Sequence, residues 1–329
     1  MENAQIRGAT GRFRCLDSEV MPAISPYAAL LARIPVRDGN AIVLGSETRY
    51  WDYGPIDADV TIVAVHGFRG EHHGLEPIVA HLDGVRVISP DLPGFGESTP
   101  MSLAEHTVTG YAAWLAAFVD ALGLTGRAVI LGHSFGSIVA AAAVAGGLST
   151  PRLVLVNPIA APALSGPKAG LTWLTVQYYR AAAALPERLG LALLGSPLVV
   201  RFTSLAMVTT KNRALRRWIH DQHDTYFSRY SDRATVLAGF AASVSSDVST
   251  AAERIAVPTL LIAADHDPIT SVRALRRLDE LFTSSTLVML SDVGHLIHYE
   301  RPREAAQAIA AFAGVGEVAD DTSAAEGLR

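Results

Sequence analysis

The stretch that decides the fold runs from residue 127 to 145 and reads Arg127-Ala-Val-Ile-Leu-Gly-His-Ser-Phe-Gly-Ser-Ile-Val-Ala-Ala-Ala-Ala-Val-Ala145. Its first apolar run predicts a buried strand, and the Ala/Val segment after Gly136 predicts a buried helix. Between them stands G-x-S-x-G, the nucleophile-elbow pattern, in which the serine occupies a strained turn. Glycines two residues either side avoid a collision with that turn. The sequence therefore predicts Ser134 as a nucleophile at a helix N-terminus, whose free N–H groups point at the substrate.

Composition limits the classes of protein that fit. The chain has 329 residues, 50% of them hydrophobic and 18% charged, so it can bury a large core. A net charge of −5 without a basic block predicts no nucleic-acid partner. The single cysteine, Cys15, fits a reducing compartment, and the N-terminus lacks the apolar segment of a secretory signal. The richest apolar window, 181–200, is broken by prolines and charges. We therefore expect no membrane span and a cytoplasmic protein, with a homodimer left open.

Apolar runs and helical periods alternate along the chain. Buried strands are expected at 60–65, 85–89, 128–131, 153–156, 259–264 and 286–290. Helices are expected at 75–82, 111–122, 272–282 and 303–312. Edge strands near 33–36 and 41–53 would be antiparallel, with Asp38-Gly39-Asn40 as a turn. This alternation predicts an α/β fold, a doubly wound, mostly parallel sheet of eight strands with helices on both faces.

One region breaks the alternation. Residues 159–249 contain no convincing buried strand, only helix-like segments separated by prolines and glycines. We expect a helical cap inserted after the sixth strand, over the carboxyl edge of the sheet where ligands bind. The core would then consist of 26–158 and 250–313. An N-terminal arm (1–25) and an acidic tail (314–329) are expected to be poorly ordered.

A serine nucleophile needs an imidazole to take its proton. Among the eleven histidines, His295 follows the last predicted strand directly, at the same sheet edge as Ser134, and is the predicted base. His298, three residues further on, is assigned a structural role.

The imidazole in turn needs a carboxylate to fix its tautomer. Asp267 follows the penultimate strand at that edge and is the predicted acid, with Asp265 as the alternative. The chain order Ser134, Asp267, His295 is the one expected of an α/β hydrolase.

Two backbone N–H groups should bind the negative charge that develops on the substrate. One is predicted at Phe135, directly after the nucleophile, and the other at Phe68, in the loop after the first buried parallel strand. The side chain of His66 is expected to brace that loop. Candidates for the substrate pocket are His133, Trp173, Tyr178 and Leu296.

The chain resembles the α/β-hydrolase superfamily, in the branch with a helical cap after strand six. The resemblance rests on five stretches that span about residues 60–310 outside the cap: His66-Gly67, Asp91-Leu-Pro-Gly-Phe-Gly-Glu-Ser98, Gly132-His-Ser-Phe-Gly136, Asp267-Pro-Ile, and Gly294-His295 with His298-Tyr-Glu-Arg-Pro302. Similar epoxide hydrolases and haloalkane dehalogenases carry Asp at the position of Ser134, which disfavours both chemistries. The three-glycine oxyanion loop of many lipases is missing. Asn157 stands at the strand-six acid position of some relatives, which favours Asp267.

The sequence therefore predicts a serine hydrolase that cleaves a carboxylic ester or related acyl compound with an apolar moiety. The alternative is a carbon–carbon bond hydrolase of the meta-cleavage type, acting on aromatic ring-fission products. A thioesterase, a perhydrolase and a non-catalytic binding relative are weaker readings. The pair His220 and His223 could chelate a metal but lacks further ligands, so neither a metal nor a cofactor is expected.

Overall fold

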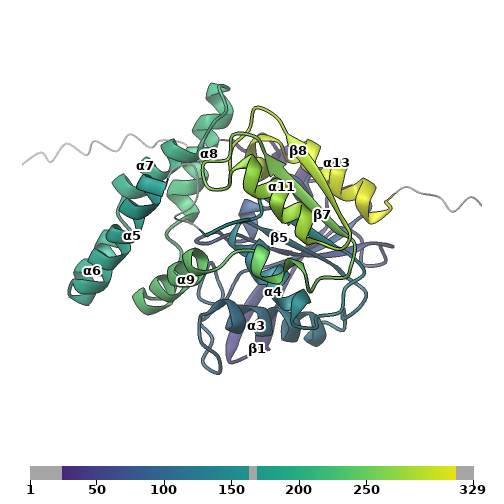
Figure 1. Cartoon of the computed structure of the whole chain (residues 1–329), viewed down its shortest axis with the longest axis horizontal. Helices are drawn as coiled ribbons and strands as arrows, with labels where there is room; N and C mark the ends of the chain where they lie inside the picture. The colour runs from purple at the N-terminus through teal and green to yellow at the C-terminus, as the bar shows by residue number, and fades with distance from the viewer. Residues whose placement is uncertain (1–23, 163–168, 316–329) are drawn as a thin grey trace, which may run out of the picture.

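The computed structural model describes residues 24–162 and 169–315 (Figure 1). Its eight-stranded sheet has the order β1-β2-β4-β3-β5-β6-β7-β8. The first two strands and the β2/β4 pair are antiparallel, and every other pair is parallel. The strands are β1 (Val36–Val43), β2 (Ser46–Tyr53), β3 (Thr61–Val65), β4 (Arg86–Pro90), β5 (Val129–His133), β6 (Leu153–Val156), β7 (Thr259–Ala264) and β8 (Ser285–Leu290). The predicted mostly parallel α/β sheet is confirmed.

Helices cover both faces of the sheet because the central strands are apolar on both sides. One buried cluster joins the sheet to α3 (Val108–Ala121), α4 (Phe135–Ala145), α10 (Ser249–Ala252) and α11 (Val272–Leu281). A second cluster joins the opposite face to α2 (Glu76–Val79), α12 (Ile297–Glu300) and α13 (Pro302–Ala313). Short α1 (Ala28–Leu31) and the 3-10 turn His72–Gly74 complete this part.

The expected turn at Asp38-Gly39-Asn40 is wrong. These residues lie inside β1. The chain reverses after the end of that strand, at Leu44 and Gly45, which have φ of 47° and 75°. Gly39 pairs with Tyr50, and a Cβ at position 39 would collide with the Tyr50 ring. The glycine therefore makes room for a cross-strand aromatic ring rather than for a turn.

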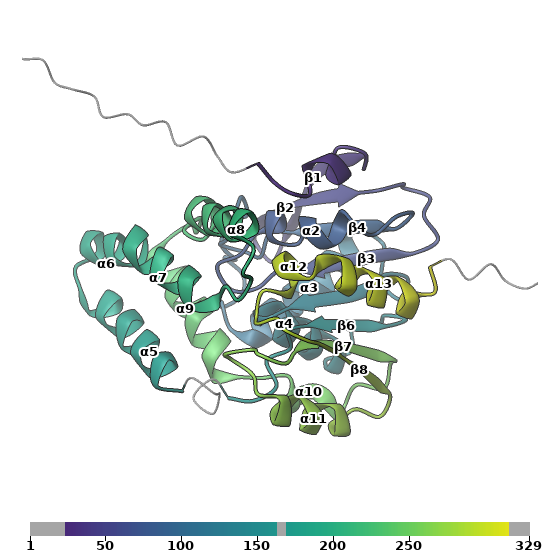
Figure 2. The same ribbon diagram turned by 90° about the horizontal axis from the view of Figure 1, so that it is seen from above.

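The helices α5 (Ala169–Ala184), α6 (Glu187–Leu194), α7 (Pro197–Met207), α8 (Arg213–Tyr226) and α9 (Arg233–Ser245) lie between β6 and β7 in the chain. Figures 1 and 2 show them together on one side of the sheet. The predicted helical insertion after strand six is confirmed. Residues 1–23 and 316–329, on which most of the expected arm and tail fall, lie outside the described residues.

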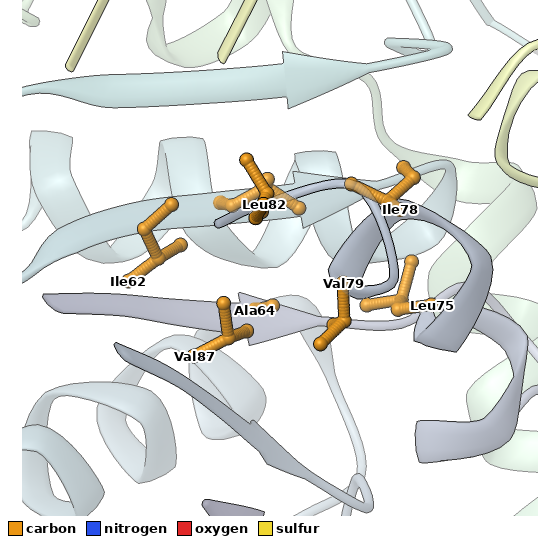
Figure 3. Close-up of a pocket in the computed structure, with 8 residues that line it drawn as sticks. Ile62, Ala64, Leu75, Ile78, Val79, Leu82 and Val87 are labelled. Atoms are coloured by element: carbon orange, nitrogen blue, oxygen red, sulfur yellow. The ribbon is translucent and has the colours of Figure 1, made fainter. Parts of the chain in front are cut away.

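A small apolar void, drawn in Figure 3, lies between the sheet and the α2 region. Its volume is about 10 Å³, and its walls are eight aliphatic side chains from β3, β4, β5 and the α2 region: Ile62, Ala64, Leu75, Ile78, Val79, Leu82, Val87 and Leu131. A cavity of that size, without a polar partner, has no room for a ligand and does not favour a bound water. We regard it as a packing defect of the core.

Candidate active site

Ser134 lies between β5 and α4 in a backbone conformation that few residues adopt, with φ 54° and ψ −117°. The turn is tight enough that a Cβ at position 132 would collide with the Gly136 carbonyl. A Cβ at position 136 would collide with the carbonyl of Val65 on the neighbouring strand. The two glycines of G-x-S-x-G are therefore required sterically, as the sequence predicts.

The structure brings the three predicted side chains together in one hydrogen-bonded row. The Oγ of Ser134 lies 2.7 Å from Nε2 of His295, and Nδ1 of His295 lies 2.7 Å from Oδ2 of Asp267. Each comes from a loop at the carboxyl end of a parallel strand: β5, β8 and β7 in turn. The His295 and Asp267 side chains are only 4% and 2% exposed. Since a carboxylate accepts from Nδ1–H, the lone pair of Nε2 faces the serine hydroxyl.

Asp267 is held in its charged form. Burial by itself would raise its pKa, but the charge and hydrogen bond of His295 outweigh this and lower the pKa below the usual value. The backbone N–H groups of Ile269 (2.8 Å) and Thr270 (3.3 Å) donate to Oδ1 and act in the same direction. A buried carboxylate in this position stabilises a positive imidazole beside it.

Asn157 is a positioning residue that sequence reasoning noticed only as a missing acid. Its Nδ2 donates to Oδ2 of Asp267 (3.1 Å) and approaches the Gly294 carbonyl (3.4 Å), so it ties the two loops together. Asp265 points elsewhere: Nδ1 of His266 lies 2.8 Å from its carboxylate, and the Val293 N–H lies 3.5 Å away. The geometry therefore favours Asp267 over Asp265 as the partner of His295.

Two observations bear on the predicted oxyanion donors Phe135 and Phe68, whose role stays a prediction. Phe135 is the first residue of α4, and the first N–H groups of a helix have no hydrogen-bond acceptor within that helix. The loop after β3 passes so close that a Cβ on Gly67 would lie 3.1 Å from the Ser134 Cβ. His66 braces this loop, since its Nε2 accepts from the Leu92 N–H at 2.8 Å. With Nε2 accepting, Nδ1 carries the proton and donates to the Gly67 carbonyl, also at 2.8 Å.

Comparisons with known proteins agree with this architecture. A family model described as the alpha/beta hydrolase fold matches residues 60–302. The chain belongs to this family. Lipase 1 of Psychrobacter immobilis is 23% identical over 297 residues, covering 83% of this chain and 82% of the relative. The crystal structure of a membrane phospholipase A, a bacterial virulence factor, covers 87% of both chains with a TM-score of 0.68 and 21% identity. That of a thermophilic esterase from Thermogutta terrifontis covers 84% of this chain and 97% of the other, with a TM-score of 0.63 and 22% identity.

Two further histidines of this α/β hydrolase lie near His295. The His133 ring lies 5.8 Å from that of His295 and 4.1 Å from that of His298, centroid to centroid. Burial, followed by the nearby His295, lowers the pKa of His133 to about 3. Burial likewise lowers the pKa of His298 well below its usual value. Both rings are therefore neutral at pH 7 and place no positive charge beside His295.

The other pocket candidates of the hydrolase lie at different depths. Leu296 is buried in a cluster with Trp218, Ile219 and Tyr299. Tyr178 is half-buried on α5, and its hydroxyl donates to the Leu193 carbonyl at 2.9 Å. Trp173, near the start of α5, is 57% exposed. No contact in the described residues joins Tyr178 or Trp173 to Ser134, so their roles stay predictions.

Arg69 fastens the cap of the hydrolase to the loop that carries Phe68, and sequence reasoning missed it. It is 3% exposed and has φ 58°, a strained value for a non-glycine residue. Its guanidinium donates to the cap carbonyls of Phe227 (2.8 Å) and Leu194 (2.9 Å) and lies 4.6 Å from the Phe227 ring. The Phe68 ring beside it packs against the rings of cap residues Tyr179 and Phe240, with 6.0 Å between ring centroids in each pair.

One group of potential metal ligands occurs among the described residues. One ligand atom each from Glu71, His72 and His73 lie within 4.8 Å of one another. His72 Nδ1 is engaged by Asp91 at 2.9 Å, and the ring stacks on Trp51 with centroids 3.2 Å apart. His73 Nδ1 bonds to Glu71. The second carboxylate oxygen of Glu71, Oε2, is buried without a hydrogen bond and lies 3.6 Å from the Arg229 guanidinium. His220 and His223 both turn Nδ1 to Ser204 Oγ, at 2.6 and 2.7 Å, rather than toward a shared ligand.

Proposed function

We propose that this α/β hydrolase is a serine esterase that cleaves a carboxylic ester with an apolar moiety through an acyl-enzyme. The observation that carries the proposal is the row Ser134–His295–Asp267 at the carboxyl edge of the sheet, with two 2.7 Å contacts and with His295 and Asp267 buried. These are the distances at which a proton passes from a hydroxyl to an imidazole.

The reaction follows from the roles that the row permits. His295 Nε2 takes the Ser134 proton as Oγ attacks the ester carbonyl, and the carbonyl electrons move onto oxygen. The backbone N–H groups of Phe68 and Phe135 would bind that oxyanion. His295 then protonates the leaving alcohol as the tetrahedral intermediate collapses to the acyl-enzyme. A water, deprotonated by His295, releases the acid and restores Ser134, while Asp267 stabilises the imidazolium in both halves.

An apolar substrate is supported by the side chains that meet over the elbow. The Phe68 ring packs against the rings of Phe95 and Phe135, with centroids 5.7 and 6.4 Å away. From the cap, the rings of Tyr179 and Phe240 pack against it as well. Mostly apolar and aromatic surroundings are typical of sites for small apolar ligands. The relatives named as a lipase and an esterase support an ester as the scissile group.

Two measurements test the proposal. We expect a fluorophosphonate probe to label Ser134 of the folded protein, and Ser134→Ala to abolish labelling and turnover. Folded protein without labelling would refute a serine hydrolase and favour a non-catalytic binding protein. A substrate panel then identifies which bond the protein cleaves. It contains p-nitrophenyl esters of rising acyl length, thioesters, an ester offered with hydrogen peroxide as the acyl acceptor, and a dienone-type diketone acid. Turnover of the diketone acid without turnover of the esters would refute the esterase assignment in favour of carbon–carbon cleavage.

The cytoplasmic location and the homodimer stay predictions. Fractionation of the native host and light scattering of the purified chain would decide them.

A further inference from the structure

Exposed large apolar side chains concentrate on one part of the cap. Of the twelve described ones, seven lie between residues 173 and 205. Three of them, Leu198, Phe202 and Leu205, follow the i, i+4, i+7 spacing of one face of α7, with 83%, 59% and 57% exposure. We call these three residues the cap stripe. An apolar stripe of this kind on a surface helix marks a contact surface.

The cap stripe is not the face by which α7 packs on the protein. Val200 and Ser204 are the buried residues of this helix, and Ser204 bonds to His220 and His223 of α8. Helix α7 is therefore apolar on its outer face as well as on its packed face. The neighbouring α6 adds Leu189, which is 58% exposed.

Charge separates this region from the rest of the chain. Residues 169–245 carry nine lysines and arginines against four acidic residues, a net charge of +5 in a chain whose total is −5. Four of these cations, Lys211, Arg213, Arg216 and Arg217, are exposed and follow the C-terminus of α7 within ten residues. No carboxylate in the described parts of the chain lies within ion-pair distance of them.

The position of these cations is electrostatically unfavourable in the protein alone, although the Arg216 guanidinium donates to the Thr210 carbonyl at 2.8 and 3.1 Å. Three of them occupy the first two turns of α8, which has no acidic residue in its first turn. The positive end of the helix dipole and the like charges disfavour that arrangement. An external anionic surface would remove the penalty, since basic clusters beside an amphipathic helix are the pattern of binding to anionic lipids.

We propose that the cap docks on a lipid bilayer that contains anionic headgroups, with the cap stripe inserted among the acyl chains near the surface and Lys211, Arg213, Arg216 and Arg217 against the headgroups. A second copy of the chain fits this surface less well, because a two-fold contact between caps would bring the cations of both copies together.

The docked protein lies on the bilayer and does not span it. The stretch Glu187–Met207 is apolar and long enough to cross a membrane, and 22% of its most apolar window is buried. It is nevertheless two helices, of 8 and 11 residues, separated by Gly195 and Ser196. A span requires about 20 continuous helical residues. Short apolar helices beside a cationic cluster instead suit the interfacial plane.

Vesicle co-sedimentation of the full chain tests the proposal, with Ser134→Ala as the background so that no lipid is consumed. We expect binding to phosphatidylcholine vesicles containing phosphatidylglycerol and weaker binding to phosphatidylcholine alone. The triple variant Leu198→Ser, Phe202→Ser, Leu205→Ser should lose at least about tenfold in affinity for both. Each of the single variants Lys211→Gln, Arg213→Gln and Arg217→Gln should bind anionic vesicles about fivefold more weakly, with no change in affinity for phosphatidylcholine vesicles.

The matched control is Leu103→Ser, which removes an exposed leucine (77%) from the loop before α3 in the sheet domain and should leave binding unchanged. The same substitutions are also made in the chain that keeps Ser134. Hydrolysis of a water-soluble ester by these variants reports that each one is folded. No sedimentation of the parent chain, or equal sedimentation of the stripe variant, would overturn the proposal. So would light scattering that shows a dimer in the parent and a monomer in the stripe variant without lipid, because the stripe would then be a self-association surface.

Discussion

Replacing Asp267 by Asn tests the geometry of the row directly. The side chain keeps its size, but the atom facing His295 Nδ1 must now be either an amide oxygen or an amide nitrogen. In the protein, that atom accepts from His295 Nδ1 at 2.7 Å and from Asn157 Nδ2 at 3.1 Å, while Oδ1 accepts from two backbone N–H groups. The two backbone donors require the amide oxygen at Oδ1, so the NH₂ group is forced toward His295.

An NH₂ group facing Nδ1 makes that nitrogen an acceptor and moves the ring proton to Nε2. The imidazole then presents N–H to Ser134 and cannot take the serine proton. The same NH₂ also meets the Nδ2 donor of Asn157, and the imidazolium loses its counter-charge. For a tautomer switch of this kind we expect kcat to fall about 10³- to 10⁴-fold, which corresponds to about 4–5.5 kcal/mol of activation free energy.

The assay is the steady-state hydrolysis of the best p-nitrophenyl ester by Asp267→Asn, compared with Asp265→Asn. The second variant removes a carboxylate of the same loop whose partners are His266 and the Val293 N–H, so we expect less than about a tenfold loss. Circular dichroism and a denaturation midpoint establish that both are folded. If Asp265→Asn is the more damaged enzyme, or Asp267→Asn keeps more than a tenth of the activity, the assignment of the acid is wrong.

Two further predictions concern stability. Arg69→Ala leaves the cap carbonyls of Phe227 and Leu194 without their donor, so we expect the free energy of unfolding in urea to fall by about 3 kcal/mol and proteolysis to begin in the cap. Arg69→Lys should recover only part of this loss. An unchanged urea midpoint for Arg69→Ala would contradict the fastening role of this side chain. His133 has a folded-state pKa of about 3, below the unfolded value near 6.5, so the stability that its neutral form contributes is complete above pH 6.5 and is lost as the pH falls. Between pH 5.5 and 4, the free energy of unfolding of His133→Gln should therefore vary with pH by about 1.4 kcal/mol per unit less than that of the parent, and parallel curves would show that the ring is not held neutral.

Local sequence determined the elements that pack on both faces. The runs at Leu153–Val156 and Thr259–Ala264 are strands with the predicted bounds, because a short β-branched or aliphatic run bounded by turn residues is typical of a strand buried on both sides. The elbow was equally readable, since the glycines at 132 and 136 and the strained Ser134 are one steric problem with one solution. Where a residue has two roles, the pattern misled: Gly39 signals a turn, but in the sheet it makes room for Tyr50.

The sequence by itself determined the sheet, the order of Ser134, Asp267 and His295, and the edge at which they meet, because residues that follow parallel strands emerge at a common edge. The tertiary structure alone decided which polar groups hold the row in place. Asn157 reaches Asp267 across 110 positions, and Arg69 reaches Phe227 across 158. Contacts of that separation leave no local periodicity in the chain, since they depend on how two distant loops are set against each other by the strands beneath them.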